Sequence, residues 1–114
     1  MPTERPEAAI LAAILQYLGT RGIYAWRVNT GSMVKTNRAG KSRLVRFGKR
    51  GTPDIAGIVK AQNGRALFIE VKRPGEHPTT EQSLRLNILR SEHAIAFWAT
   101  SVDDVAKELA AVNL

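Results

Sequence analysis

Near the N-terminus, apolar residues recur every three or four positions, which is the spacing of one face of an α-helix. This spacing predicts a helix over residues 4–18, with Pro6 tolerated in its first turn and Gly19 and Gly22 ending it. Glu7 lies on the same line, so the apolar face begins with a carboxylate. The apolar positions are Ile10, Leu11, Ile14, Leu15, Tyr17 and Leu18.

The next part of the chain favours β-structure and loops. Residues 23–29 are aromatic and β-branched, which predicts a strand. Residues 30–42 are polar and basic, which predicts a loop, and residues 43–47 can pair back as a second strand. Another loop is predicted over residues 48–53.

A β-hairpin is predicted after this loop. Residues 54–60 and 65–72 have strand composition, and the Gly-containing segment 62–64 joins them. On the second strand, one face is apolar throughout. The opposite face begins apolar and ends with Glu70 and Lys72, so an acidic and a basic group project side by side.

The register of this hairpin decides whether Asp54 joins Glu70 and Lys72. A two-residue turn at 63–64 would pair position 54 with position 73 and turn Asp54 away from Glu70. A three-residue loop at 62–64 would pair position 54 with position 72 and place the three side chains on one face. Gly64 suits the longer loop, whose last position is left-handed. The sequence permits this cluster without requiring it.

The last third of the chain predicts a helix, a strand and a second helix. Thr79 and Gln82 have the spacing of a capping box, so a helix should start there and run to about Ser91. Residues 94–100 form a continuous apolar run, which is typical of a buried strand. Ser101 is expected to cap a final helix, which runs from Val102 to Val112. The element order predicts an α/β fold with a mixed central sheet flanked by helices.

Length and composition limit the classes of protein. With 114 residues, the chain suffices for one domain but not for two, so residues 1–114 are expected to form a single domain. It contains no cysteine, which excludes disulfides, thiolate metal sites and cysteine nucleophiles. The uncharged stretch 8–20 is amphipathic and does not have the character of a membrane span. We expect an intracellular, cytoplasmic protein without membrane contacts.

The positive charge is concentrated in one segment. The net charge is +7, and residues 21–50 carry nine Lys and Arg residues with no Asp or Glu, so the rest of the chain is slightly acidic. A basic segment inside a domain is typical of a nucleic-acid surface, although it could also be a merely solubilising face. The candidate DNA-binding residues in this segment are Arg27, Lys35, Arg38, Lys41, Arg43, Lys49 and Arg50.

Two carboxylates converging near such a basic surface would form an all-oxygen site suited to Mg²⁺ or Mn²⁺. A lysine beside the metal could orient or deprotonate a water molecule, or stabilise the charge on a reacting phosphate. If Asp54, Glu70 and Lys72 do cluster, they therefore have the groups needed for phosphodiester hydrolysis.

These residues also match a family pattern. Pro53-Asp54 followed by Glu70-Val71-Lys72 resembles the PD-(D/E)XK nuclease motif. The element order resembles the restriction-endonuclease-like αβββαβ core of that superfamily, with an extra C-terminal helix. The finer resemblance is to VRR-NUC domains, which are similar to Holliday-junction resolvases. Its matching segments are residues 51–54, 69–75 and 80–82, with Glu7 and residues 27–31 also fitting the pattern.

The resemblance implies roles for particular groups. Asp54, Glu70 and the Val71 carbonyl would bind a divalent metal, Mg²⁺ or Mn²⁺. Lys72 would act on the nucleophilic water. Glu7 would contribute to the metal shell through water, and Gln82 would support the site.

The same resemblance implies a metal-dependent DNA endonuclease that is structure-specific for branched DNA such as a four-way (Holliday) junction. It further implies a homodimer, because resolving a junction needs two paired cuts, and a prokaryotic or viral source. Two other functions stay open. One is a non-catalytic nucleic-acid-binding module on the same fold, and the other is an RNA-processing nuclease.

Each candidate also has a purely structural interpretation. Asp54 could be a turn residue after Pro53, and Glu70 and Lys72 could be a solvated strand end. Glu7 could serve only the helix dipole, and Gln82 only the capping box. Trp26 and Trp98 are predicted to be core residues and His77 a loop residue, because of the segments in which they lie.

Overall fold

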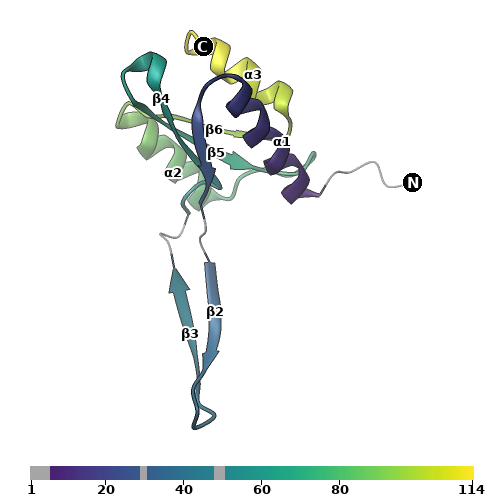
Figure 1. Cartoon of the computed structure of the whole chain (residues 1–114), viewed down its shortest axis with the longest axis vertical. Helices are drawn as coiled ribbons and strands as arrows, with labels where there is room; N and C mark the ends of the chain where they lie inside the picture. Colours follow the sequence, from purple (N-terminus) through teal and green to yellow (C-terminus); the bar gives the residue numbers. More distant parts are fainter. Residues whose placement is uncertain (1–5, 29–30, 48–50) are drawn as a thin grey trace, which may run out of the picture.

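The computed structural model describes residues 6–28, 31–47 and 51–114 (Figure 1). In chain order its elements are α1 (Glu7–Thr20), β1 (Tyr24–Arg27), β2 (Gly31–Thr36), β3 (Ser42–Phe47), β4 (Ile55–Val59), the 3₁₀ turn η1 (Lys60–Gln62), β5 (Arg65–Val71), α2 (Thr80–Ser91), β6 (Ile95–Ala99) and α3 (Val102–Ala111). No helix among the described residues is both long and apolar enough to cross a membrane.

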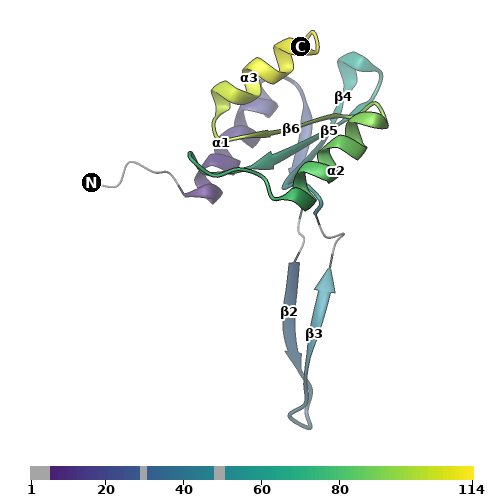
Figure 2. The ribbon, with the colours of Figure 1, turned by 180° about the vertical axis from the view of Figure 1, so that it is seen from behind.

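The body of the molecule is a four-stranded sheet in the order β1-β4-β5-β6. β4 pairs antiparallel with β1 and β5, whereas β6 pairs parallel with β5 because helix α2 carries the chain back across the sheet. Figures 1 and 2 show α1 and α3 on one face of this sheet and α2 on the other. The predicted mixed sheet flanked by helices is therefore confirmed.

The main hydrophobic core lies between the sheet and the two helices α1 and α3. Alternate residues of β5 point into it, because successive side chains on a strand face opposite sides. The core residues are Ile10, Leu11, Ile14 and Leu18 of α1, Ile23, Ile55 and Val59 on and near β1 and β4, Leu67, Ile69 and Val71 of β5, Ile95, Phe97 and Ala99 of β6, and Val105 and Leu109 of α3. The other face of β5 carries Phe68 and Glu70 and lies under α2.

Helix α1 ends later than its glycines suggested. The predicted start at residue 4 falls on residues outside the described part of the chain, and the described helix begins after Pro6. It continues through Gly19 to Thr20, two residues beyond the predicted end. The chain turns at Gly22, which has a left-handed φ of +72°, and the Ile23 N–H then bonds the Leu18 carbonyl.

The predicted loop over residues 30–42 is wrong. Strand β2 begins at Gly31 and pairs antiparallel with β3, with Lys35 opposite Arg43. The side chain of Asn37 accepts the N–H groups of Ala39 and Lys41, and Gly40 has a φ of +82°. The turn is therefore a three-residue loop that ends in a left-handed glycine.

This hairpin forms a sheet of its own and does not extend the body sheet. Figure 1 shows it projecting from the body. The radius of gyration is 16.1 Å, where about 13 Å is expected for a compact chain of this length. We refer to residues 31–47 as the arm.

Candidate active site

Asp54 and Glu70 come together where strand β4 begins and β5 approaches its end. Ile55 pairs with Ile69, so the same register carried one step further places Asp54 opposite Glu70. The connection between the strands consists of η1 followed by Asn63 and Gly64, and is thus neither of the two turns considered from the sequence. Lys72 projects to the same side as Glu70, two residues further along the chain.

The Asp54 residue is held from both neighbouring strands. Its Oδ2 atom accepts the backbone N–H of Val71 at 2.8 Å, and its backbone carbonyl accepts the N–H of Val28 at 2.7 Å. The first bond fixes the carboxylate against β5, and the second fixes the backbone against the end of β1. Asp54 is therefore placed by the sheet although it precedes the first residue of β4.

The Val71 carbonyl points from β5 toward the neighbouring chain segment that contains Asp54. The N–H and C=O of one strand residue point to the same neighbouring strand, and the Val71 N–H points to Asp54. Extension of the β4–β5 register places Pro53 opposite Val71. Because proline has no N–H, Pro53 cannot donate a ladder hydrogen bond to this carbonyl. A proline at this position thus leaves the Val71 carbonyl without this ladder hydrogen bond.

Glu70 is a buried carboxyl group with only 4% of its surface exposed. Burial raises its pKa to about 9, and the hydrogen bond and negative charge of Asp54 add to the rise. The positive charge of Lys72 lowers this pKa, while the negative charge of Glu7 raises it. Without a cation, the site therefore favours a proton between the two carboxyl groups at neutral pH.

Gln82 connects the first turn of α2 to this carboxyl group. Thr79 and Gln82 form the predicted capping box, in which each side chain accepts the backbone N–H of the other residue. The amide nitrogen Nε2 of Gln82 also donates to Oε1 of Glu70 at 3.3 Å. Gln82 therefore both caps the helix and contacts Glu70, so the two interpretations of this residue are compatible.

The structure places Lys72 directly after β5, where its backbone N–H donates to the Ala99 carbonyl at 2.9 Å. The turn that follows is closed by Arg73, whose backbone N–H and Nε both donate to Oε1 of Glu76. The hydrogen bond from Arg73 also lowers the pKa of Glu76. Lys72 is half-buried, so its cation stands at the edge of the acidic pair.

Glu7 is exposed in the first turn of α1 and acts on Glu70 through its charge. Among the described residues, no three His, Cys, Asp or Glu side chains are grouped so that they could hold a metal ion. The acidic pair of Asp54 and Glu70 is thus not joined by Glu7 as a third carboxylate. A role for Glu7 through water stays a prediction.

The predicted DNA-binding residues separate into three groups. Lys35, Arg38, Lys41 and Arg43 lie on the arm, and all four are exposed. Arg27 is exposed on β1 but pairs with Ile55, which places it on the opposite side of the sheet from Asp54. Lys49 and Arg50 lie outside the described residues.

One prediction about the aromatic residues is wrong. Trp26 is 43% exposed and contacts the 73% exposed Tyr24, with ring centroids 5.6 Å apart. Helix α2 packs on β6 and β5, and the β1–β4 half of this sheet face remains open, including Ile58 opposite Tyr24. In the sequence, Tyr24 and Trp26 are two residues apart on a strand, which predicts that they lie on the same face of the sheet. This spacing does not indicate whether a helix covers that face.

Trp98 is half-buried and pairs in register with Glu70. His77 is exposed in the loop before α2, as expected, and meets the Trp98 ring edge-on at 5.6 Å between centroids. These two rings therefore border the acidic pair on the β6 side. Sequence spacing did not connect His77 with the site, because the contact depends on the parallel pairing of β6.

No family model matches the chain, and no curated protein matches its sequence. A solved structure described as "VRR_NUC domain" matches with a TM-score of 0.63 and 19% sequence identity. The match covers 90% of this chain and 92% of that chain. At this identity the likeness concerns the course of the backbone, and it extends over nearly the whole of both chains. The chain therefore has the fold of a VRR_NUC domain.

Proposed function

We propose that this protein is a divalent-metal-dependent endonuclease that hydrolyses phosphodiester bonds in DNA. The observation that carries the proposal is the contact between the carboxyl groups of Asp54 and Glu70, with the Val71 backbone bonded to Asp54 and the charge of Lys72 close enough to act on Glu70. The VRR_NUC fold supports it, because the name of that domain refers to nucleases. The basic arm supports nucleic acid as the substrate.

The residues present fit a hard divalent cation. Asp54, Glu70 and the Val71 carbonyl offer oxygen atoms alone, which are the ligands that Mg²⁺ and Mn²⁺ prefer. Burial raises the pKa of Glu70 and the neighbouring Asp54 adds to the rise, and a pair of carboxyl groups in contact is stabilised when it shares a proton or a cation. When bound, Mg²⁺ or Mn²⁺ would supply Lewis-acid activation of the phosphodiester and of water.

The side chains around this position have separate tasks. Asp54 and Glu70 would hold the cation, and their positions are fixed by Val71 and Gln82 respectively. Lys72 places a positive charge on the same side, where it would stabilise the charge that develops on the phosphate or orient the attacking water. Glu7 would act on this water network from the start of α1.

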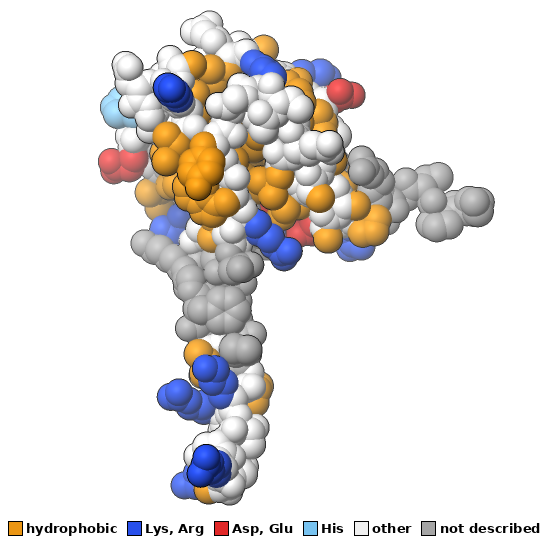
Figure 3. Space-filling view, viewed as in Figure 1, with side chains coloured by type: hydrophobic (Ala, Val, Ile, Leu, Met, Phe, Trp, Pro, Cys, Tyr) orange, Lys and Arg blue, Asp and Glu red, His pale blue; other side chains and the backbone are white. Residues whose placement is uncertain are grey.

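We further propose that the enzyme cuts branched DNA as a symmetric homodimer. A four-way junction needs two matched cuts, and a twofold dimer presents two identical sites. The open apolar surface formed by Tyr24, Trp26 and Ile58 favours a second copy of the chain as its partner. Its side chains carry no charge, whereas a surface for DNA is basic. Figure 3 shows hydrophobic side chains on the body and Lys and Arg along the arm.

A cleavage panel tests the proposal. Duplex, flap, fork and four-way junction DNA are incubated with the protein in Mg²⁺, in Mn²⁺ and in EDTA. We expect cleavage in either metal, none in EDTA, and the highest rate on the four-way junction. Metal-independent cleavage would refute the metal mechanism. Binding without cleavage in either metal would favour the non-catalytic module, and selective cleavage of RNA counterparts would favour an RNA-processing nuclease.

A further inference from the structure

The arm has no protein surface to pack against along most of its length. Every residue from 34 to 44 is exposed, and the two strands pair only with each other. An isolated two-stranded hairpin is marginally stable in water. A binding partner that covers the arm would therefore add contacts that the body does not provide.

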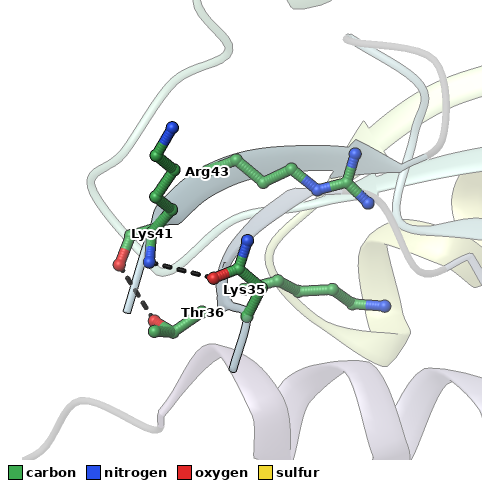
Figure 4. Close-up of a pocket in the computed structure, with 6 residues that line it drawn as sticks. Lys35, Thr36, Lys41 and Arg43 are labelled. Carbon is green, nitrogen blue, oxygen red and sulfur yellow. Dashed lines mark hydrogen bonds between the residues drawn. The ribbon is translucent and has the colours of Figure 1, made fainter. Parts of the chain in front are cut away.

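The charges on the arm identify the chemistry of this partner. Lys35 stands directly opposite Arg43, and Figure 4 shows the two side chains extending side by side. Like charges directly opposite on paired strands are destabilising unless a counter-charge lies between them. Lys41 joins them in lining a cavity of about 440 Å³ near the tip of the arm, which also takes in the uncharged Thr36, Asn37 and Ser42 and so includes residues from both sides of the hairpin. A polyanion would supply this counter-charge.

In the outer part of the arm, over residues 34–36 and 42–44, the opposite side is uncharged. Val34 stands opposite Leu44, with 65% and 55% of their surfaces exposed, and the hydroxyl groups of Thr36 and Ser42 are hydrogen-bonded to each other at 2.9 Å. Because side chains alternate along a strand, Lys35 and Arg43 share the other side. Over these paired residues the arm thus has one cationic side and one neutral side.

The arm begins and ends close to the candidate active site. The Val28 N–H, three residues before the arm, bonds the carbonyl of Asp54, seven residues after it. Each strand of the arm has six residues, which corresponds to about 20 Å of reach. A duplex with one phosphate at the acidic pair would therefore lie within reach of the arm over roughly six base pairs.

We infer that the arm is a β-ribbon that lies with its cationic side in the major groove of duplex DNA beside the cleaved bond. The major groove, about 12 Å wide, admits a two-stranded ribbon, and Lys35 and Arg43 would reach the phosphates along its walls. The substrate would then need a double-stranded segment of roughly six base pairs on the arm's side of the cut. This inference rests on the proposed function and specifies its substrate.

The test measures DNA binding in EDTA, so that it does not depend on catalysis. The variant Lys35→Gln/Arg43→Gln removes the cationic side, and Val34→Thr/Leu44→Thr is the matched change on the neutral side. We expect the first variant to bind a 16-base-pair DNA duplex about tenfold more weakly, with a slope of log affinity against log salt lower by about 2. The second variant should retain the wild-type slope. Equal slopes in all three proteins would overturn the inference.

Three further substrates test the fit to the groove. Wild-type affinity should fall when one duplex segment of a forked DNA is shortened below about six base pairs, and the Lys35→Gln/Arg43→Gln variant should lose this length dependence. The variant should bind an RNA duplex as the wild type does, because the A-form major groove is too narrow to admit side chains. An equal loss on RNA duplex or single-stranded DNA would overturn the placement in the groove.

The two proposals fail in different ways. If the protein binds duplex DNA through the arm but cleaves nothing in Mg²⁺ or Mn²⁺, the nuclease proposal fails and the arm inference holds. If it cleaves normally and the arm variants bind as the wild type does, only the arm inference fails. Thermal melting of each variant checks that the body remains folded, which is expected because Lys35, Arg43, Val34 and Leu44 are exposed.

Discussion

The Gln82 side chain donates a hydrogen bond to Glu70 at 3.3 Å while its own carbonyl oxygen accepts the Thr79 backbone N–H. A single amide group therefore links the start of α2 to a buried carboxyl group on β5. The helix start and the acidic site are thus coupled through one side chain.

Replacement of Gln82 should affect both stability and the site. Gln82→Ala removes half of the capping box and the contact to Glu70, so we expect a loss of about 1 kcal/mol in unfolding free energy together with weaker Mn²⁺ binding. Thr79→Ala is the matched control, because it removes the other half of the box and leaves Glu70 untouched. Chemical denaturation and Mn²⁺ titration measure the two effects. Equal Mn²⁺ affinity in both variants would show that Gln82 acts only as a cap.

The raised pKa of Glu70 predicts how the stability of the metal-free protein depends on pH. The folded state holds a proton on Glu70 up to about pH 9, whereas the unfolded state releases it near pH 4.5. The folded state therefore loses stability as pH rises from about 4.5 through 9, by at most about 1.4 kcal/mol per pH unit. Glu70→Gln should flatten this dependence in EDTA melting curves, and Glu92→Gln, at an exposed position, should not.

Asp54→Asn should abolish cleavage and leave binding to junction DNA intact or tighter. Under the proposed function, the substitution removes a negative charge that would face the metal and the phosphate, while the amide oxygen can still accept the Val71 N–H. Cleavage rates and anisotropy titrations in Ca²⁺ separate the two effects. Wild-type cleavage by this variant would contradict the assignment of the metal site.

Lys72→Ala should lower turnover about a hundredfold with little change in substrate affinity, because the ammonium group stabilises charge that develops only during reaction. Lys60→Ala, at the opposite end of β4, is the matched control and should cleave normally. Single-turnover rates and binding constants measured on one junction provide the comparison. Normal turnover with a large loss of affinity would make Lys72 a phosphate-binding residue.

Trp26→Arg should convert the proposed homodimer to a monomer. A buried tryptophan at an interface contributes about 2 kcal/mol or more, which corresponds to a dissociation constant raised at least about thirtyfold. Leu44→Gln, on the arm, should leave the dimer intact. Sedimentation equilibrium gives the mass of each protein. A wild-type monomer would refute the homodimer, and a dimeric Trp26→Arg variant would place the interface elsewhere.

The sequence predicted the body of the fold because its elements have a buried side. The apolar run that became β6 and the capping box of α2 were both identified in this way. The sequence allowed Asp54 and Glu70 to share a face of the sheet without requiring it, because this needs a connection with an odd number of residues. The exact pairing could not be predicted, because the five-residue connection through η1 places Asp54 opposite Glu70, whereas a three-residue loop would have placed it opposite Lys72.

The arm and the aromatic surface could not be predicted from hydrophobic pattern. Residues 34–44 of the arm are exposed on both sides, and residues 30–42 have no alternation of apolar and polar positions to indicate a strand. The three-residue loop with a left-handed glycine, considered for Gly64, occurs at Gly40 instead. The exposure of Trp26 follows from the placement of α2 over β5 and β6, which is a property of the tertiary fold.

The hydrogen bond between Val28 and Asp54 joins the chain before the arm to the chain after it, so residues 29–53 form a loop closed at the body. Lengthening a closed loop costs little, about 0.6 kcal/mol for each doubling of its length. The body can therefore accept ribbons of different length or sequence at this point while Asp54 keeps its position. Under the proposed function, recognition of DNA by the arm and chemistry at the acidic pair would then be separable, and the first could be exchanged by design without rebuilding the second.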